Sequence, residues 1–515
     1  SIRKAGNKVR ITAQLIKAKD GYHQWSNTYD RDLTDIFAVQ DEIAGAIVRE
    51  MSAALPALAR ALGAMQPVAR ADIGAYEAFL LARERMTQIG TQAAYEEAVA
   101  LLDDAIARDP HYAPALAWRS YAAAMLSDVL GSVGDTPMAE ALPVIRDYAE
   151  RAIAEDPESP EAVFALGNYY GQLALSEDMQ YLDKAIATLR QAVALRPSFP
   201  QAQNDLAFFV GYTGEKAEAI AILEDVLVND PGLRDANVSY INNLARTGRF
   251  EDAEAALGRW ARVRPGTPDL EIMRAYLLAS QGRLADAWRQ TTAIHDTGAV
   301  PAGLLATMRH IIRSRLGDGQ WLLANAKTPR EQAVGALLAG DTRRALELVD
   351  SDPLARQTAG EALGSYIPVH YAGGDARAVV AYYATEMGTP ASFVAAVQYC
   401  QCNAVPLLLA LREAGHADFR PLLDAWKGEI EAQREFYSGS FSWRSDRADI
   451  AALEGDFGTA KKLYGAAMDA GWRTPDFVAR DLRAFLPQDP DFDALLSRMR
   501  DLVDTERRSL GMPPL

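Results

Sequence analysis

The sequence predicts a mainly α-helical fold, a right-handed superhelix of stacked helical hairpins that follows a small β-meander. Three observations predict it. Pro231 and Pro265 are separated by the same interval as Ala219 and Ala253, which indicates a repeat. Each repeat unit contains two apolar, helix-like segments around a central turn. Residues 8–16, in contrast, alternate apolar and polar side chains, which is typical of a half-buried strand.

Residues 1–56 are expected to form a three-stranded meander and one covering helix. Apolar side chains at positions 9, 11, 13 and 15 alternate with polar ones, and Asp20-Gly21 marks the turn before a third strand over Tyr22–Tyr29. A sheet with one apolar face needs a cover, and the segment from Thr34 to Leu55 carries apolar side chains at helical spacing. Residues 57–74 are weakly patterned and are interpreted as a linker.

Residues 75–301 carry the repeat pattern, in which a proline closes each unit: Pro110, Pro157, Pro197, Pro231 and Pro265. The last two intervals match a period of about 34 residues with one helical hairpin per unit, which is typical of tetratricopeptide repeats. The first two intervals are longer and place extra residues in turns near Ser127–Thr136 and Leu173–Met179. Small residues recur where the two helices of a hairpin should cross closely: Ala98, Ala185, Ala219, Ala253 and Ala287.

The repeat pattern weakens after residue 301 without stopping. Residues 302–447 are interpreted as degenerate helical repeats, and residues 448–515 as a last repeat with C-terminal capping helices. The segments Gly335–Val349, Ala362–Tyr383 and Ala448–Gly471 each contain a glycine turn before an amphipathic helix. The whole chain is therefore expected to be one helical array behind its N-terminal meander.

The two ends of the chain resemble one family. Residues 9–48 read VRITAQLIKAKDGYHQWSNTYDRDLTDIFAVQDEIAGAIV. This run resembles the end of the TolB-like domain of bacterial signalling proteins. Near the C-terminus, Gly471-Trp472, Leu482-Arg483 and Asp489-Pro490-Asp491-Phe492 resemble the cap of the same proteins, with Asp491 where Arg is usual. The resemblance implies the last part of an α/β TolB-like domain, followed by tetratricopeptide repeats.

The resemblance also implies a biological setting. That family occurs in class III adenylyl/guanylyl cyclases and in membrane-anchored winged-helix transcription regulators. We predict a non-catalytic protein–protein interaction scaffold and regulatory sensor region of a bacterial signalling protein. One alternative is the regulatory part of a class III cyclase. Another is the small-molecule-sensing domain of a transcription regulator. A cleft for it would lie in the aromatic zone from Tyr366–Tyr383 to Phe436–Trp443, but we favour ordinary core packing for these aromatics.

The resemblance leaves the compartment and the parent protein open. A cyclase-type parent implies the bacterial cytoplasm, and an anchored regulator implies the periplasmic side of the inner membrane. The chain starts at Ser1 within a strand pattern, so we expect it to be a piece of a longer protein.

Composition and motifs argue against several functions. The 515-residue chain has a net charge of −16, whereas a nucleic-acid binder needs a basic face. The longest apolar run, near Ala404–Leu411, is too short for a membrane span. No nucleotide-binding loop, zinc-protease motif or nucleophile elbow occurs, so we expect no enzyme activity, cofactor or metal here. Cys400 and Cys402 lack zinc-site spacing and are interpreted as packed thiols.

The function predicted for a repeat array is binding. Stacked first helices line a concave groove, where we expect a protein or peptide partner; self-association of the repeats into a homodimer is the other mode considered. An Asn recurs in three successive repeats, and its amide can pair with the N–H and C=O of an extended peptide. Ordinary polar surface residues are the alternative explanation for these Asn side chains. The predicted groove residues are Phe164, Asn168, Asn204, Phe208, Asn242, Arg246 and Arg274.

Overall fold

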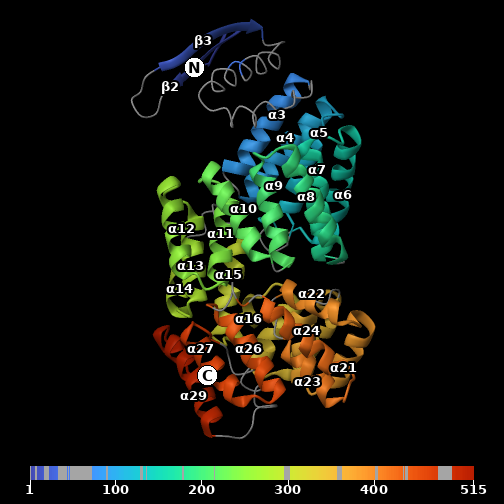
Figure 1. Cartoon of the computed structure of the whole chain (residues 1–515), viewed down its shortest axis with the longest axis vertical. Coiled ribbons are helices and arrows are strands. Elements are labelled where there is room, and N and C mark those ends of the chain that lie inside the picture. The colour runs from blue at the N-terminus through green and yellow to red at the C-terminus, as the bar shows by residue number, and fades with distance from the viewer. Residues whose placement is uncertain are drawn as a thin grey trace.

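The protein is described by a computed structural model in which α-helices dominate, as the sequence predicts (Figure 1). The structure describes residues 2–5, 8–16, 23–32, 43, 46, 72–88, 91–127, 132–134, 136–176, 179–213, 215–294, 302–356, 362–400, 404–432, 434, 439–473 and 490–515. Within these residues no helix is both long enough and apolar enough to cross a lipid bilayer.

An antiparallel meander opens the described part of the chain. Strands β1 (Ile2–Ala5), β2 (Lys8–Ile16) and β3 (His23–Asp32) lie in the order β1-β2-β3. Arg10 lies opposite Asp30, and its Nε donates to Asp30 Oδ1 over 2.6 Å. The predicted meander is therefore confirmed. Most of the predicted covering helix lies outside the described residues. Of that segment only Ile43 and Ala46 are described, and both are helical.

The first array is a stack of helical hairpins in chain order (Figure 1). Its described helices pair as α3 (Ile73–Gln88) with α4 (Gln92–Arg108), α5 (Ala113–Met125) with α6 (Met138–Glu155), α7 (Pro160–Ser176) with α8 (Leu182–Leu195), α9 (Pro200–Val210) with α10 (Lys216–Asn229), α11 (Arg234–Arg246) with α12 (Phe250–Val263), and α13 (Pro268–Ser280) with α14 (Leu284–Ala293). A short 3-10 turn, η3 (Gly211–Thr213), lies between α9 and α10.

Small side chains sit at the predicted helix crossings. Ala98, Ala185, Ala219, Ala253 and Ala287 are all fully buried. A larger residue there would hold the two helices of a hairpin apart. The extra residues between the early repeats are not all in turns, because Leu173–Ser176 extend helix α7 itself.

The rest of the molecule, from α15 onward, is less regular, and we call it the second half. Its described helices are α15 (Ala302–Arg315), α16 (Gly319–Asn325), α17 (Pro329–Leu338), α18 (Thr342–Ser351), α20 (Ile367–Ala372), α21 (Ala376–Tyr382), α22 (Pro390–Cys400), α23 (Val405–Glu413), α24 (Phe419–Ala432), α26 (Phe441–Glu454), α27 (Phe457–Asp469) and α29 (Pro490–Ser509). The single-turn π-helices η5 (Ala362–Tyr366) and η6 (Tyr383–Met387) interrupt it. Helices α17 to α29 contribute to one large hydrophobic core.

The second half folds back onto the first array (Figure 1). The C-terminal helix α29 reaches α14, where the Ala285 N–H donates to Glu506 Oε2 over 2.7 Å. Within the second half, Arg507 Nη1 of α29 also donates to the carbonyl of Leu316, which follows α15, over 2.6 Å. Turns also meet: a Cβ on Gly282 would lie 2.6 Å from the Gly471 carbonyl oxygen. The second half therefore packs against the α13–α14 turn of the first array.

Candidate binding face of the helical array

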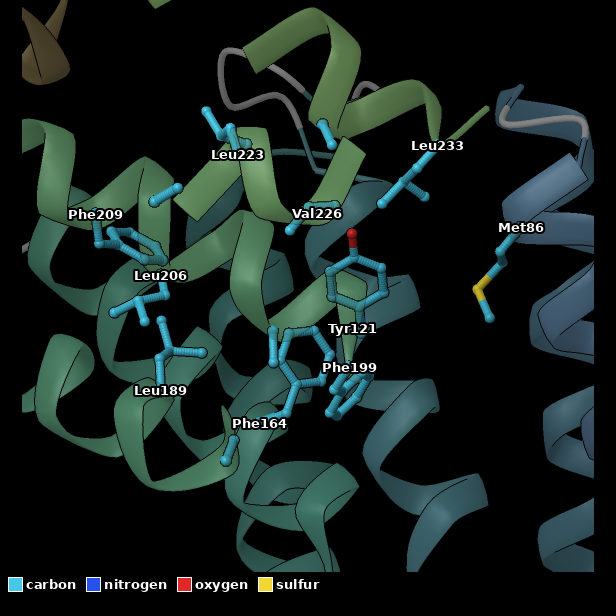
Figure 2. Packing of buried hydrophobic residues seen from close by; sticks show 14 of the residues in the cluster. Met86, Tyr121, Phe164, Leu189, Phe199, Leu206, Phe209, Leu223, Val226 and Leu233 are labelled. Atoms are coloured by element: carbon cyan, nitrogen blue, oxygen red, sulfur yellow. The ribbon is translucent and has the colours of Figure 1, made fainter. Parts of the chain in front are cut away.

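The first array curls until its early and late hairpins face each other across their first helices. In Figure 2, Met86 of α3 lies across from Tyr121 and Leu233. These residues line one narrow cleft together with Thr87, Tyr95, Trp118, Gln201, Arg234 and Asp235. Because α3 and α11 line the same cleft although they are far apart in the chain, the first helices form the concave side of the array.

We call this side the inner face. It is defined by side chains of α7, α9, η3, α11 and α13: Asn168, Gln172, Gln201, Asn204, Asp205, Phe208, Tyr212, Asn242, Arg246 and Tyr276. The repeat period brings equivalent positions side by side on it. Tyr276, for example, lies 34 residues after Asn242 and donates its hydroxyl hydrogen to Asn242 Oδ1 over 2.8 Å.

Two of the predicted Asn residues meet at a buried carboxyl group. Asn168 of α7 donates through Nδ2 to Asp205 Oδ2 over 2.8 Å. Asn204 of α9 donates to the other carboxyl oxygen of Asp205 over 3.4 Å. All three side chains are more than nine-tenths buried. The predicted Asn168 and Asn204 are thus held in place by a residue that was not among the sequence-based candidates.

Burial changes the protonation of this carboxyl group. It raises the pKa of Asp205 to about 7, and the nearby Asp235 carboxylate acts in the same direction. The hydrogen bonds from Asn168 and Asn204 favour the charged form and limit the rise. Asp205 therefore titrates near neutral pH, on the inner face.

Several polar atoms on the inner face are buried without a hydrogen-bond partner among the described residues. Such an atom costs about 1–3 kcal/mol when nothing pairs with it. Most buried polar atoms in proteins are paired, so each exception needs an explanation. The unpaired atoms on this face are Asn168 Oδ1, Gln172 Oε1, Gln201 Oε1, Asn204 Oδ1 and Arg246 Nε.

Phe164 was predicted to line the groove, and this prediction is wrong. The Phe164 side chain is completely buried. Its ring centroid lies 5.0 Å from that of Phe199 and 5.2 Å from that of Tyr121 (Figure 2). Residues of α5 and of the turn before α9 pack against this position, so an aromatic ring there fills the core instead of facing a ligand.

The remaining predicted residues divide into two groups. Phe208, Asn242 and Arg246 are half-buried on the inner face, and the Phe208 ring packs edge-on against Tyr212 at 5.1 Å. Arg274 is exposed and lies 3.5 Å from Glu271 of its own helix. Arg274 therefore does not lie with the other predicted groove residues on the inner face.

Some residues of this face were missed although the repeat period carries a signal for them. Tyr212 lies one period before the predicted Arg246, and Tyr276 lies one period after the predicted Asn242. Gln172, Gln201 and Asp205 have no predicted residue one period away, so spacing alone does not select them.

Lys216 was also missed, because it begins the second helix of its hairpin. It lies at the start of α10 with only 8% of its surface exposed. Its Nζ is 3.1 Å from the place where a Cβ of Gly211 would stand, so its side chain runs along η3. A residue of a second helix thus reaches the base of the inner face.

The aromatic zone of the second half is part of the core. Tyr366, Tyr382, Tyr383 and Trp443 are all buried and belong to its hydrophobic cluster. Trp443 Nε1 donates to the Ile430 carbonyl over 2.8 Å. The described rings of this zone therefore fill space between helices, which is the core packing favoured from the sequence. Residues 436–438 lie outside the described part.

The structure offers little material for metal chemistry in its described part. There, no three His, Cys, Asp or Glu side chains come together as a metal site. The interpretation of Cys400 and Cys402 as packed thiols lies outside the described side chains. What the inner face can do with its amides, hydroxyls and cations is bind a polar ligand.

Comparison with known proteins identifies a sequence relative. No protein-family model matches the chain. Over 186 residues it is 34% identical to "Putative adenylate cyclase 3" of Rhizobium meliloti (strain 1021), a match that covers 36% of this chain and 30% of the relative. The chain thus spans less than a third of that relative's length.

Solved structures similar to the chain are distant from it. The crystal structure of the type IV pilus biogenesis factor PilW is 18% identical, covers 46% of this chain and 100% of PilW, and has a TM-score of 0.32. The human IFIT1 dimer with PPP-AAAA is 14% identical over 84% of this chain and 87% of IFIT1, with a TM-score of 0.31. TM-scores of this size carry no conclusion about the ligand of this chain.

Proposed function

We propose that the chain is a non-catalytic protein-interaction scaffold whose inner face binds an extended peptide segment of a partner protein. The observation that carries the proposal is the set of buried polar atoms without described partners along α7, α9 and α11. Most of them are amide oxygens, which accept hydrogen bonds, and a peptide backbone supplies N–H donors at regular intervals.

The chemistry of this face fits a peptide in a second respect. Phe208 and Tyr212 are aromatic side chains beside the amide groups, and rings of this kind supply apolar contact area at protein interfaces. The proposed contact residues are Gln201, Asn204, Phe208, Asn242 and Arg246, with Asn168 positioned behind them by Asp205. Arg274 and Phe164 are not part of the proposal.

We further propose that this scaffold is the regulatory region of a bacterial signalling protein of the nucleotide-cyclase type. The match to the putative adenylate cyclase of Rhizobium meliloti supports it. The alternative parent is a membrane-anchored transcription regulator. The coding sequence upstream of Ser1 decides between them: a cyclase catalytic domain supports the first, and a winged helix with a membrane span supports the second.

The peptide proposal is tested by affinity. Peptides are selected from a random library on the immobilised full chain, labelled, and titrated by fluorescence polarisation. The double variant Gln201→Ala with Asn204→Ala removes two inner-face amides and should weaken binding by roughly tenfold or more.

A matched control lies in the same hairpin. Asn229 is exposed at the end of α10, and its Nδ2 donates to the Asp225 carbonyl of its own helix over 2.9 Å. Asn229→Ala should leave the affinity unchanged. Equal affinities for the double variant, the control and the wild type would rule out the inner face as the peptide site.

A further inference from the structure

Lys216 and Arg246 lie together at the base of the inner face with no acidic partner among the described residues. Lys216 is more than nine-tenths buried at the start of α10. Arg246, at the end of α11, interacts electrostatically with it. Neither side chain makes a hydrogen bond or ion pair to a described residue, and Arg246 Nε is buried without a partner there. The chain has a net charge of −16, so acidic side chains outnumber basic ones. Two neighbouring cations without a described acidic partner are therefore unexpected in it.

The surroundings of this pair are positive as well. Arg246 also acts on Tyr212 of η3 and on Tyr276 of α13. Tyr276 also interacts electrostatically with Arg315 of α15. Arg315 Nη1 donates to the Ala279 carbonyl over 2.7 Å. Arg315 Nη2 donates to the Gly471 carbonyl over 3.1 Å, so this cation is held by backbone oxygens instead of a described carboxylate.

We propose that Lys216 and Arg246 form a binding site for an oxyanion, a carboxylate or phosphate group carried by the ligand of the inner face. The inference rests on the proposed peptide-binding function and specifies the chemistry of its ligand. The ammonium of Lys216 offers three donors and the guanidinium of Arg246 offers five. No described residue accepts a hydrogen bond from either, and Arg246 Nε is buried in this state. Tyr212 interacts electrostatically with Arg246, and its ring packs against Phe208.

The electrostatic surroundings of Lys216 support this assignment. Burial lowers the pKa of Lys216 well below its usual value, and the charge of Arg246 lowers it further. Burial likewise lowers the pKa of Arg315 to about 10, with Arg473 acting in the same direction. A cation that is buried without a counter-charge destabilises the fold, and an oxyanion removes this cost when it binds.

The geometry also explains the glycine that precedes the lysine helix. Gly211 is buried, and a Cβ at that position would lie 3.1 Å from Lys216 Nζ and 4.0 Å from Asn243 Oδ1. The missing side chain leaves room for the ammonium group to reach the inner face. Helix α22 of the second half also packs against η3, so the site lies where the two halves of the molecule meet.

The test uses the full chain and simple probes. Inorganic phosphate and acetate are titrated separately by isothermal calorimetry at constant ionic strength, because the two arms distinguish a phosphate-bearing from a carboxylate-bearing ligand. Lys216→Met and Arg246→Met should each weaken the binding of the preferred probe by roughly tenfold to a hundredfold. Arg262→Gln, a change at an exposed cation on α12, is the matched control and should bind as the wild type does.

Thermal unfolding separates this role from a structural one. Lys216→Met removes a buried cation that has no described partner, so it should raise the melting temperature of the ligand-free protein while it removes anion binding. A lower melting temperature with intact binding would overturn the proposal. So would binding of neither probe to the wild type, or equal binding to all variants, which would indicate an adventitious ion only.

The outcome for the anion site is distinguishable from that for the peptide face. If library peptides bind wild type and Lys216→Met equally well but lose affinity with the amide double variant, the peptide proposal stands and the anion site fails. If the probes bind at Lys216 and Arg246 but no peptide is selected, the anion site stands and the peptide proposal fails.

Discussion

At the scale of single residues, Asp205 shows how the inner face is organised. Its carboxyl group is buried between Asn168 and Asn204, which donate one amide hydrogen bond each. Those bonds use the amide nitrogens and leave both amide oxygens without described partners. One acidic residue therefore fixes the orientation of two Asn side chains at the inner face.

The raised pKa of Asp205 predicts a pH-dependent stability. In the unfolded chain Asp ionises near pH 3.8, but in the folded protein it holds its proton until about pH 7. The unfolded state therefore binds fewer protons between these values, and stability falls as the pH rises through this window. Asp205→Asn does not titrate, so its stability advantage over the wild type should grow by about 2 kcal/mol from about pH 5.5 to about pH 8.

This prediction is checked by urea unfolding of both proteins across that pH range. Asp183→Asn, a change at an exposed residue on α8, serves as the control and should follow the wild type at every pH. An advantage of Asp205→Asn that is constant with pH would mean that Asp205 is already ionised at the acidic end of the range, contrary to its buried environment.

The sequence could identify some of these residues and not others. Asn204 and Asn242 follow from the repeat period together with amide chemistry. Phe164 follows the same logic and is nevertheless buried, because Phe199 and Tyr121 of the neighbouring elements pack against it. The direction of the Lys216 side chain depends on the space at a neighbouring glycine. Neither these ring contacts nor that space can be read from the spacing of residues.

At the scale of elements, the hairpins were predictable because one period governs them. Proline begins α9 and α13, and fully buried Ala219, Ala253 and Ala287 mark the crossings. The irregular elements were not predictable. The extension of α7 and the π-helices η5 and η6 interrupt the period, and their hydrogen-bond pattern depends on packing against neighbouring helices.

The turns between helices make a prediction at this scale. Gly282 has a φ of +79°, and a Cβ there would also collide with the Gly471 backbone. Gly340 has a φ of +80° with nothing within 4 Å of its Cβ position, so it isolates the backbone strain, about 1–2 kcal/mol. Gly282→Ala should therefore lower the melting temperature more than Gly340→Ala does.

Thermal denaturation followed by circular dichroism measures both variants directly. The difference between them reports the contact between the α13–α14 turn and Gly471. Equal losses for Gly282→Ala and Gly340→Ala would contradict a close turn-to-turn contact between the two halves.

At the scale of the whole molecule, the second half closes onto the turns of the first array. Helix α29 returns to α14, where Glu506 accepts a hydrogen bond from the Ala285 N–H. The sequence predicts the mainly helical array and the meander, but such contacts join residues that no period relates. Closure places the cations Lys216, Arg246 and Arg315 at the junction of the halves, beside the inner face.

A partner peptide is proposed to lie on the inner face, and site-specific photo-crosslinking tests this most directly. A benzophenone amino acid replaces either Phe208, half-buried on the inner face, or Val263, which is exposed beside a second cavity lined by Val228, Tyr240 and Trp260. We predict that a library-selected peptide crosslinks at position 208 and not at position 263. Crosslinking at position 263 alone would contradict the proposal.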